Sequence, residues 1–118
     1  MNIHHIGILV DNYEATKNLY VADFWYQVIK ESVNSDKFCF LSKDGALPYI
    51  ELLSLQKNIL NLPAMHIAYQ VENIQIEYDK FLQKWYESIL APWNASMIKQ
   101  KAFLRIKNED TVIELVEI

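Results

Sequence analysis

The sequence predicts an α+β fold in which two tandem βαβββ modules form one curled mixed sheet around a cavity. The main observation is an internal repeat, because HIGILVDN at residues 5–12 matches HIAYQVEN at residues 66–73, 61 positions later. A second match pairs FL and IELL in residues 40–53 with FL and IELV in residues 103–116, at an offset of 63. Since the offset changes by only two residues, we interpret the chain as a single domain, 1–118, with duplicated modules at 3–54 and 64–117.

The composition fits one folded domain and narrows the range of partners. The chain has 118 residues, of which 52% are hydrophobic and 22% are charged, as in ordinary globular domains. A net charge of -4 argues against nucleic acid, whose binding requires clustered basic residues. The single cysteine, Cys39, cannot form an internal disulfide, and residues 1–5 do not resemble a secretory signal or a membrane span. We therefore expect a cytoplasmic protein that binds neither nucleic acid nor membranes, with Cys39 in its core.

The first module has the pattern of a strand, a helix and three further strands. Residues 3–10 are apolar and β-branched, which indicates a buried strand. Asp11 or Asn12 is placed to cap the helix that follows. The apolar face of that helix is predicted to consist of Ala15, Leu19, and Ala22 or Val21. The three remaining strands are expected at residues 25–32, 37–42 and 48–54.

The second module repeats this order after a short linker at residues 56–63. Its first strand is expected at residues 64–71, and Asn73 is placed to cap a longer helix. That helix carries apolar residues at a spacing of 3.6, namely Ile74, Tyr78, Phe81, Leu82 and Trp85. The closing strands are expected near residues 88–90, 100–106 and 111–117.

Alternation along the strands predicts that the repeated polar residues share one face of the sheet. In residues 64–71, Ile67 and Val71 take the face under the helix, so His66 takes the opposite face. In the last strand, the apolar residues Ile113 and Leu115 face the helix, so Glu114, which lies between them, faces the opposite side. By the repeat, the concave face receives two histidines and two glutamates, His5, Glu51, His66 and Glu114.

Two imidazoles and two carboxylates in one cavity predict a site for a divalent metal ion. Carboxylates are seldom buried unless they are paired or bound to metal, and two of them balance the charge of one divalent ion. Four N/O ligands leave open positions on a six-coordinate ion, which is typical of a catalytic site. Taken alone, each glutamate is better explained as an exposed strand residue and each histidine as a surface or satisfied core residue, but their recurrence at equivalent positions favours metal. His4 is not counted, because alternation directs it under the helix or into solvent.

These strings resemble the vicinal oxygen chelate superfamily, which includes glyoxalase I, bleomycin-resistance proteins and methylmalonyl-CoA epimerase. The likeness of HIGI, IELL, HIAYQV and IELVE is strongest to the epimerase-like branch. There, a first-strand His, a fourth-strand Glu or Gln, a mid-chain His and a final-strand Glu bind the metal. The resemblance spans essentially the whole chain. It implies the same paired-module fold and a divalent ion, with Co, Mn, Zn, Ni and Fe as candidates.

The resemblance also implies an enzyme, an epimerase or isomerase that removes a proton α to a carbonyl group. The metal would stabilise the resulting enolate, and Glu51 or Glu114 would act as the base. Their pseudo-twofold relation suits an epimerase, which needs a proton on either face of the enolate. An acyl-CoA thioester, as in methylmalonyl-CoA epimerase, is the expected substrate. Epimerases also carry a second carboxylate that is not a ligand, for which only Glu31 and Asp36 are available.

Other residues are candidates for contacts with the substrate. Residues 91–95 (APWNA) resemble a substrate-proximal loop of epimerase-like relatives, so Trp93 is expected either in the pocket wall or in the core. Three basic residues are candidates for contacts with coenzyme A phosphates or for a solvated strand edge: Lys99, Lys101 and Arg105.

Two other classes of function stay open. A glyoxalase I-type lyase or a metal-dependent resistance transferase would use the same ligands with a thiol cosubstrate. A metal-free protein that binds a small antibiotic is the other alternative, although such relatives characteristically lose the four ligands. An aromatic content of 13% can supply an oligomer interface, and relatives often dimerise, so we expect a homodimer.

Overall fold

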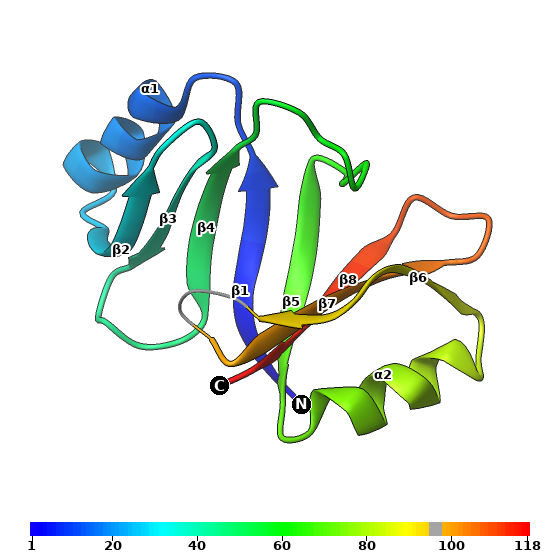
Figure 1. Ribbon diagram of the computed structural model, residues 1–118. Helices are drawn as coiled ribbons and strands as arrows, with labels where there is room; N and C mark the ends of the chain where they lie inside the picture. The colour runs from blue at the N-terminus through cyan, green and yellow to red at the C-terminus, as the bar shows by residue number, and fades with distance from the viewer. Residues whose placement is uncertain (95–97) are drawn as a thin grey trace.

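The computed structural model describes residues 1–94 and 98–118 and shows the order β-α-β-β-β twice (Figure 1). The first half consists of β1 (Asn2–Leu9), α1 (Tyr13–Asn18), a π-helical turn η1 (Leu19–Asp23), β2 (Gln27–Val33), β3 (Lys37–Ser42) and β4 (Tyr49–Ser54). The second half consists of β5 (Met65–Val71), α2 (Ile74–Leu82), β6 (Tyr86–Asn94), β7 (Gln100–Ile106) and β8 (Val112–Glu117).

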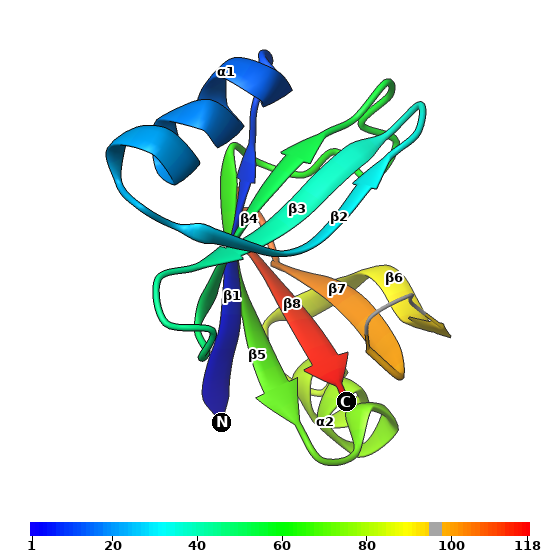
Figure 2. The same cartoon turned by 90° about the vertical axis from the view of Figure 1, so that its left-hand side faces the viewer.

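The eight strands in the described part of the chain form one mixed sheet in the order β2-β3-β4-β1-β5-β8-β7-β6. Strand β1 runs parallel to β4, and β5 runs parallel to β8, while the antiparallel pair β1–β5 joins the two halves. The sheet is strongly curled, and α1 and α2 lie outside it at opposite ends (Figures 1 and 2). The predicted α+β fold of two βαβββ modules is therefore confirmed. Neither helix of the described residues is long and apolar enough to cross a membrane.

The helix of the first half packs on the sheet mainly through Tyr13, whose side chain is 3% exposed. It contacts a cluster of buried side chains that consists of Cys39, Leu41 and Leu52. Cys39 therefore lies in the core, as expected. Asn12, one of the two predicted caps, accepts a hydrogen bond from the backbone N–H of Ala15 at 3.1 Å, which makes Tyr13 the first helical residue.

The predicted apolar face of this helix is wrong. Ala15, Leu19, Val21 and Ala22 are all exposed. The α-helix ends after six residues and continues as the π-helical turn η1, so a spacing of 3.6 does not extend through the segment. Tyr13, and Tyr20 of η1, which is partly buried, supply the contact with the sheet instead.

The second helix agrees better with its prediction. The side chain of Asn73 accepts a hydrogen bond from the backbone N–H of Ile76 at 3.1 Å, and Ile74 and Tyr78 are buried against β7 and β8. Trp85 is not part of this helix, which ends at Leu82, and it is 79% exposed. Strand β6 is also longer than predicted and includes Trp93.

A third apolar cluster lies on the concave side of the sheet and supports the cavity. It is built around Leu62, Phe103 and Val112, with further leucines of β1, β4 and the connection between β4 and β5 packed against them. The segment that the sequence suggested only as a linker therefore forms part of the concave wall.

Candidate metal centre

Four side chains from four adjacent strands meet on the concave face. They are His5 of β1, Glu51 of β4, His66 of β5 and Glu114 of β8. Gly7 pairs with Glu51 on one side and with His66 on the other, and Ala68 pairs with Glu114 and with His5. Each small residue thus lies between a glutamate and a histidine, and the two rows are related by the repeat. The structure brings together all four residues that strand alternation placed on this face.

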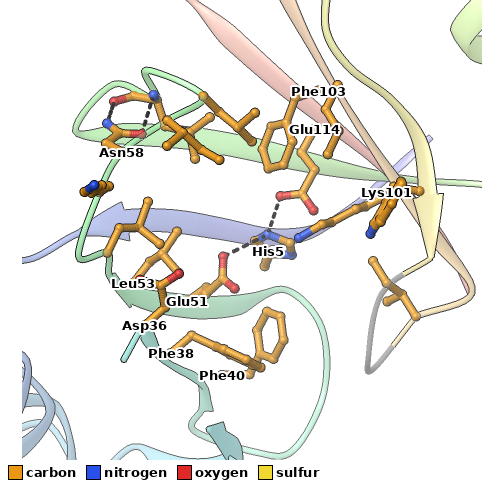
Figure 3. A pocket seen from close by; sticks show the side chains of 18 of the residues that line it. His5, Asp36, Phe38, Phe40, Glu51, Leu53, Asn58, Lys101, Phe103 and Glu114 are labelled. Carbon is orange, nitrogen blue, oxygen red and sulfur yellow. Dashed lines mark hydrogen bonds and ion pairs between the residues drawn. The ribbon is translucent and has the colours of Figure 1, made fainter. Parts of the chain in front are cut away.

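The distances within this cluster are short. Oε1 of Glu114 lies 3.0 Å from Nε2 of His5 and 3.0 Å from Nε2 of His66. Oε1 of Glu51 lies 3.4 Å from Nε2 of His5, and Figure 3 shows both carboxylates directed at that ring. The side chains of both histidines are 2% exposed and that of Glu114 is 5% exposed, whereas that of Glu51 is 13% exposed. Glu51 is therefore the most accessible member.

The electrostatics of the cluster favour a positive charge at its centre. Burial by itself lowers the pKa of His5, but hydrogen bonds and charge attraction from Glu114 and Glu51 outweigh it and raise this pKa to about 10. Burial would raise the pKa of Glu114, yet the hydrogen bonds of His5 and His66 hold it below its ordinary value. Without an ion, a proton on His5 thus compensates the two carboxylates.

The donor set fits a divalent metal ion. One ligand atom from each of the four residues lies within 4.8 Å of every other, so a single ion can reach all of them. Two imidazole nitrogens and two carboxylate oxygens suit Zn, Co, Mn, Ni and Fe, and the two negative charges balance such an ion. The cluster could therefore hold a metal ion in place of the proton on His5.

Gly7 is required for the position of His66. A Cβ atom at residue 7 would lie 2.2 Å from Cε1 and 2.6 Å from Nε2 of His66, which is closer than any real contact. The imidazole of His66 therefore lies directly over the backbone of β1, and only glycine leaves room for it.

His4 is not placed as strand alternation predicted. It is only 2% exposed, and it lies neither in solvent nor under α1. The register of β1 against β5 shifts between Ile3 and His5, and this bulge turns the ring of His4 toward Phe40. Its Nδ1 lies 2.8 Å from Nδ1 of His5. Burial, with the charge of His5 added, lowers the pKa of His4 to about 4. His4 stays outside the group of four possible ligands.

A cavity of about 590 Å³ opens above the cluster, within the size range of small-molecule sites. Most of its lining is apolar and comes from β3, β4, β6, β7 and the connection between β4 and β5. The charged residues that line it besides the cluster are Asp36, Lys57 and Lys101. The sequence did not indicate the apolar wall formed by Phe38 and Phe40, although their alternation with Cys39 was a usable signal.

Two of the four predicted substrate-contact residues line this cavity. Trp93 and Lys101 pair across β6 and β7, and Lys101 extends from β7 toward the cluster (Figure 3), with Nζ 6.0 Å from the ring centre of Phe103. Ala95, the last residue of the predicted substrate-proximal loop, lies outside the described residues.

The other two predicted contact residues have structural partners away from the cavity. Nζ of Lys99 lies 3.1 Å from Oε1 of Glu117. Arg105 donates a hydrogen bond of 2.9 Å to the carbonyl oxygen of Asn61 and thereby ties β7 to the connection between β4 and β5.

Neither candidate for a second carboxylate lies within the cluster. Glu31 accepts hydrogen bonds from Tyr13 Oη at 2.7 Å and from Lys17 Nζ at 2.6 Å, and these bonds lower its pKa. Its partners are residues of α1, so it belongs to the helix-covered face. Asp36 does line the cavity, and its Oδ1 accepts a hydrogen bond from the backbone N–H of Gln56 at 2.8 Å.

The fold and the cluster together define a protein of two βαβββ modules with a candidate divalent-metal site between them. Solved structures with this fold include a methylmalonyl-CoA epimerase variant from Streptomyces coelicolor in complex with 2-nitronate-propionyl-CoA. That structure is 21% identical, with a TM-score of 0.79 over 99% of this chain and 96% of the other. A methylmalonyl-CoA epimerase in complex with methylmalonyl-CoA and NH4+ is 24% identical, with a TM-score of 0.78 over 98% and 92% of the two chains.

A third solved structure shares the fold. A glyoxalase/bleomycin resistance protein/dioxygenase superfamily member from Vibrio splendidus 12B01 is 14% identical, with a TM-score of 0.70 over 99% of this chain and all of the other. No family model and no curated protein sequence matches the chain. The chain therefore has the glyoxalase-like fold that the sequence predicted, and the match is one of structure at low identity.

Proposed function

We propose that the protein is a metal-dependent enzyme that removes a proton from a carbon next to a carbonyl group. His5, Glu51, His66 and Glu114 would hold the ion. The observation that supports this most is the convergence of these four donors within 4.8 Å beneath a cavity. A divalent ion held there would stabilise the negative charge that develops on the carbonyl oxygen of the substrate.

Glu51 is the better candidate for the base. Its side chain is 13% exposed against 5% for Glu114, and its contact with His5 is the longer one, at 3.4 Å. Glu114 is held by both imidazoles at 3.0 Å, so moving it would disrupt the whole cluster. Glu51 would therefore take the proton from the substrate, while Glu114 keeps the two histidines in place.

For the substrate we propose an acyl-CoA thioester and, for the reaction, epimerisation at its α carbon. Similarity to structures of methylmalonyl-CoA epimerases supports this choice. Lys101 would contact a negatively charged group of the substrate. The two glutamates would already balance a divalent ion, and among the described residues Lys101 has no ion-pair partner. Trp93 would form part of the wall beside it.

The difference in exposure between Glu51 and Glu114 supports a second candidate function, that of a glyoxalase I-type lyase. Epimerisation requires proton transfer on both faces of the reacting carbon. Conversion of a hemithioacetal into a thioester instead moves one proton between neighbouring carbons, and a single carboxylate can perform it. Glu51 is the one accessible carboxylate of the cluster, which suits this single-base reaction.

Proton exchange in deuterated water separates the two candidates. The protein loaded with cobalt(II) or zinc is incubated with methylmalonyl-CoA, and deuterium at the α carbon is followed by mass spectrometry. A parallel reaction contains a hemithioacetal and measures thioester formation. Exchange without thioester formation supports the epimerase, and the reverse supports the lyase. If neither reaction exceeds that of a blank without protein, the proposed chemistry is wrong.

A further inference from the structure

His4 and His5 form a buried pair of histidines, and only His5 belongs to the four possible metal ligands. The two Nδ1 atoms lie 2.8 Å apart, which is hydrogen-bond distance. The ring of His4 is held edge-on by Phe40 and Tyr49, with ring centres 5.8 and 5.5 Å away. Among the described side chains, His4 is the hydrogen-bond partner of Nδ1 of His5.

The direction of this hydrogen bond follows from the other nitrogen of His5. Nε2 of His5 faces Glu51 and Glu114, so a bound ion takes the lone pair of Nε2. A neutral imidazole has one N–H group, which must then be on Nδ1. Nδ1 of His5 therefore donates, and Nδ1 of His4 accepts. Neutral His4 carries its own proton on Nε2.

We propose that His4 is a positioning residue of the metal centre. By accepting the Nδ1–H of His5, it fixes the orientation of that ring and the tautomer that presents Nε2 to the ion. Ligating histidines commonly donate their second N–H to a carboxylate or a carbonyl oxygen, and here the acceptor is a neighbouring imidazole. This inference rests on the proposed metal centre.

Two substitutions of His4 separate hydrogen bonding from packing. His4→Asn keeps an acceptor, because Oδ1 of asparagine is as many bonds from Cα as Nδ1 of histidine. His4→Phe keeps an aromatic ring between Phe40 and Tyr49 but removes the acceptor. We expect zinc to bind His4→Phe about 10–100-fold more weakly than wild type, and His4→Asn to stay close to wild type. The measurement is a competition titration with a chelating indicator, with circular dichroism of the metal-free proteins as the check on folding.

Equal zinc affinity of His4→Phe and wild type would overturn the inference and leave the metal centre intact. Equal weakening of both variants would also overturn it, because ring packing rather than the acceptor would then be responsible. If wild type binds no zinc, the metal centre itself fails, and the inference fails with it.

A measurement on the wild-type protein covers the case in which His4→Phe does not fold. In protein with isotopically labelled histidines, an N–H···N hydrogen bond gives a scalar coupling between the two nitrogen nuclei. We expect this coupling between Nδ1 of His5 and Nδ1 of His4 in the zinc-loaded protein. A Nδ1–H signal of His5 without the coupling would contradict the proposal.

Discussion

Glu114 is the residue on which the charge balance of the site depends. It is the most buried carboxylate of the cluster, and one of its oxygens accepts hydrogen bonds from two histidines. A carboxylate in such a position is stable only if positive charge lies next to it. In the metal-free protein the proton on His5 supplies that charge, and an ion would replace it.

The raised pKa of His5 predicts how the stability of the metal-free protein depends on pH. The folded pKa is about 10, above the ordinary value of 6.5, so the folded state holds an extra proton between these values. The stabilisation is fully present below pH 6.5 and is lost as the pH rises through about 10. One proton corresponds to a slope of up to about 1.4 kcal/mol per pH unit.

Urea denaturation of chelator-treated protein over this pH range measures that slope. A His5→Asn variant is the matched control, since it removes the titrating ring, and its stability should depend less on pH. A wild-type stability that stays flat or increases over the range would contradict the assignment of the proton to His5.

The two glutamates are predicted to respond differently to neutralisation. Glu51→Gln should keep part of the bound metal, because Glu114 and both histidines remain, but it should slow proton exchange by about 10²–10⁴-fold if Glu51 is the base. Metal analysis and the deuterium assay of the same samples measure both effects. Glu87→Gln, at an exposed position of β6, is the control. Full exchange activity in Glu51→Gln would assign the base elsewhere.

At the scale of elements, the two rows of the cavity floor show what a repeat and strand alternation can predict. The rows Glu51–Gly7–His66 and Glu114–Ala68–His5 follow from regular strands paired in register, so alternation found all four polar members. It failed for His4, because a bulge inserts one residue into β1 and no residue type marks its position. Helical periodicity, which predicted the apolar face of the first helix, failed where the α-helix continues as the π-helical turn η1 and the spacing of side chains changes.

Gly7→Ala is predicted to damage the site rather than the fold. The new Cβ would lie 2.2 Å from the ring of His66, so that ring must leave the cluster, and zinc should bind about tenfold more weakly or worse. Gly45→Ala is the opposite case. Its backbone has φ +80° with free space around the Cβ position, so stability should fall by about 1–2 kcal/mol while zinc binding stays unchanged.

Zinc titration and thermal unfolding of both glycine variants distinguish these effects. Unchanged zinc affinity in Gly7→Ala would show that His66 is free to move without loss of the site.

The side chains of Asn12 and Asn73 cap α1 and α2 in the same way, so their replacement should have the same effect on stability. Asn12 and Asn73 each accept a hydrogen bond of 3.1 Å from the backbone three residues on. Replacing either by alanine should cost about 1 kcal/mol of stability, which denaturation in urea measures. Since both caps lie outside the cavity, zinc affinity should not change, and a loss of zinc in either variant would contradict this separation.

At the scale of the whole molecule, the site lies where the two halves meet. Strands β1 and β4 supply His5 and Glu51, and strands β5 and β8 supply His66 and Glu114. The sequence could predict this junction because both halves carry the same polar pattern. It could not predict the shape of the cavity, since the wall formed by Leu60 and Leu62 comes from a segment without a counterpart in the repeat.

An ion bound by both halves should stabilise the whole domain. Because it binds the folded state only, saturating metal should raise the free energy of unfolding by about 2–4 kcal/mol through mass action. The melting temperature should rise accordingly when cobalt(II) or zinc is added to chelator-treated protein. The same addition to His66→Ala should produce a much smaller rise, and an equal rise would place the ion elsewhere.

The most direct test of the metal centre is elemental analysis of purified protein after dialysis against zinc or cobalt(II). Glu114 supplies a charge and His66 a neutral nitrogen donor, so neither Glu114→Gln nor His66→Ala retains both the affinity and the geometry of the site. Wild type should retain about one ion per chain, as expected for a single site with four protein ligands, and the two variants should retain little. Equal metal in wild type, Glu114→Gln and His66→Ala would contradict the metal centre and favour a metal-free binding protein.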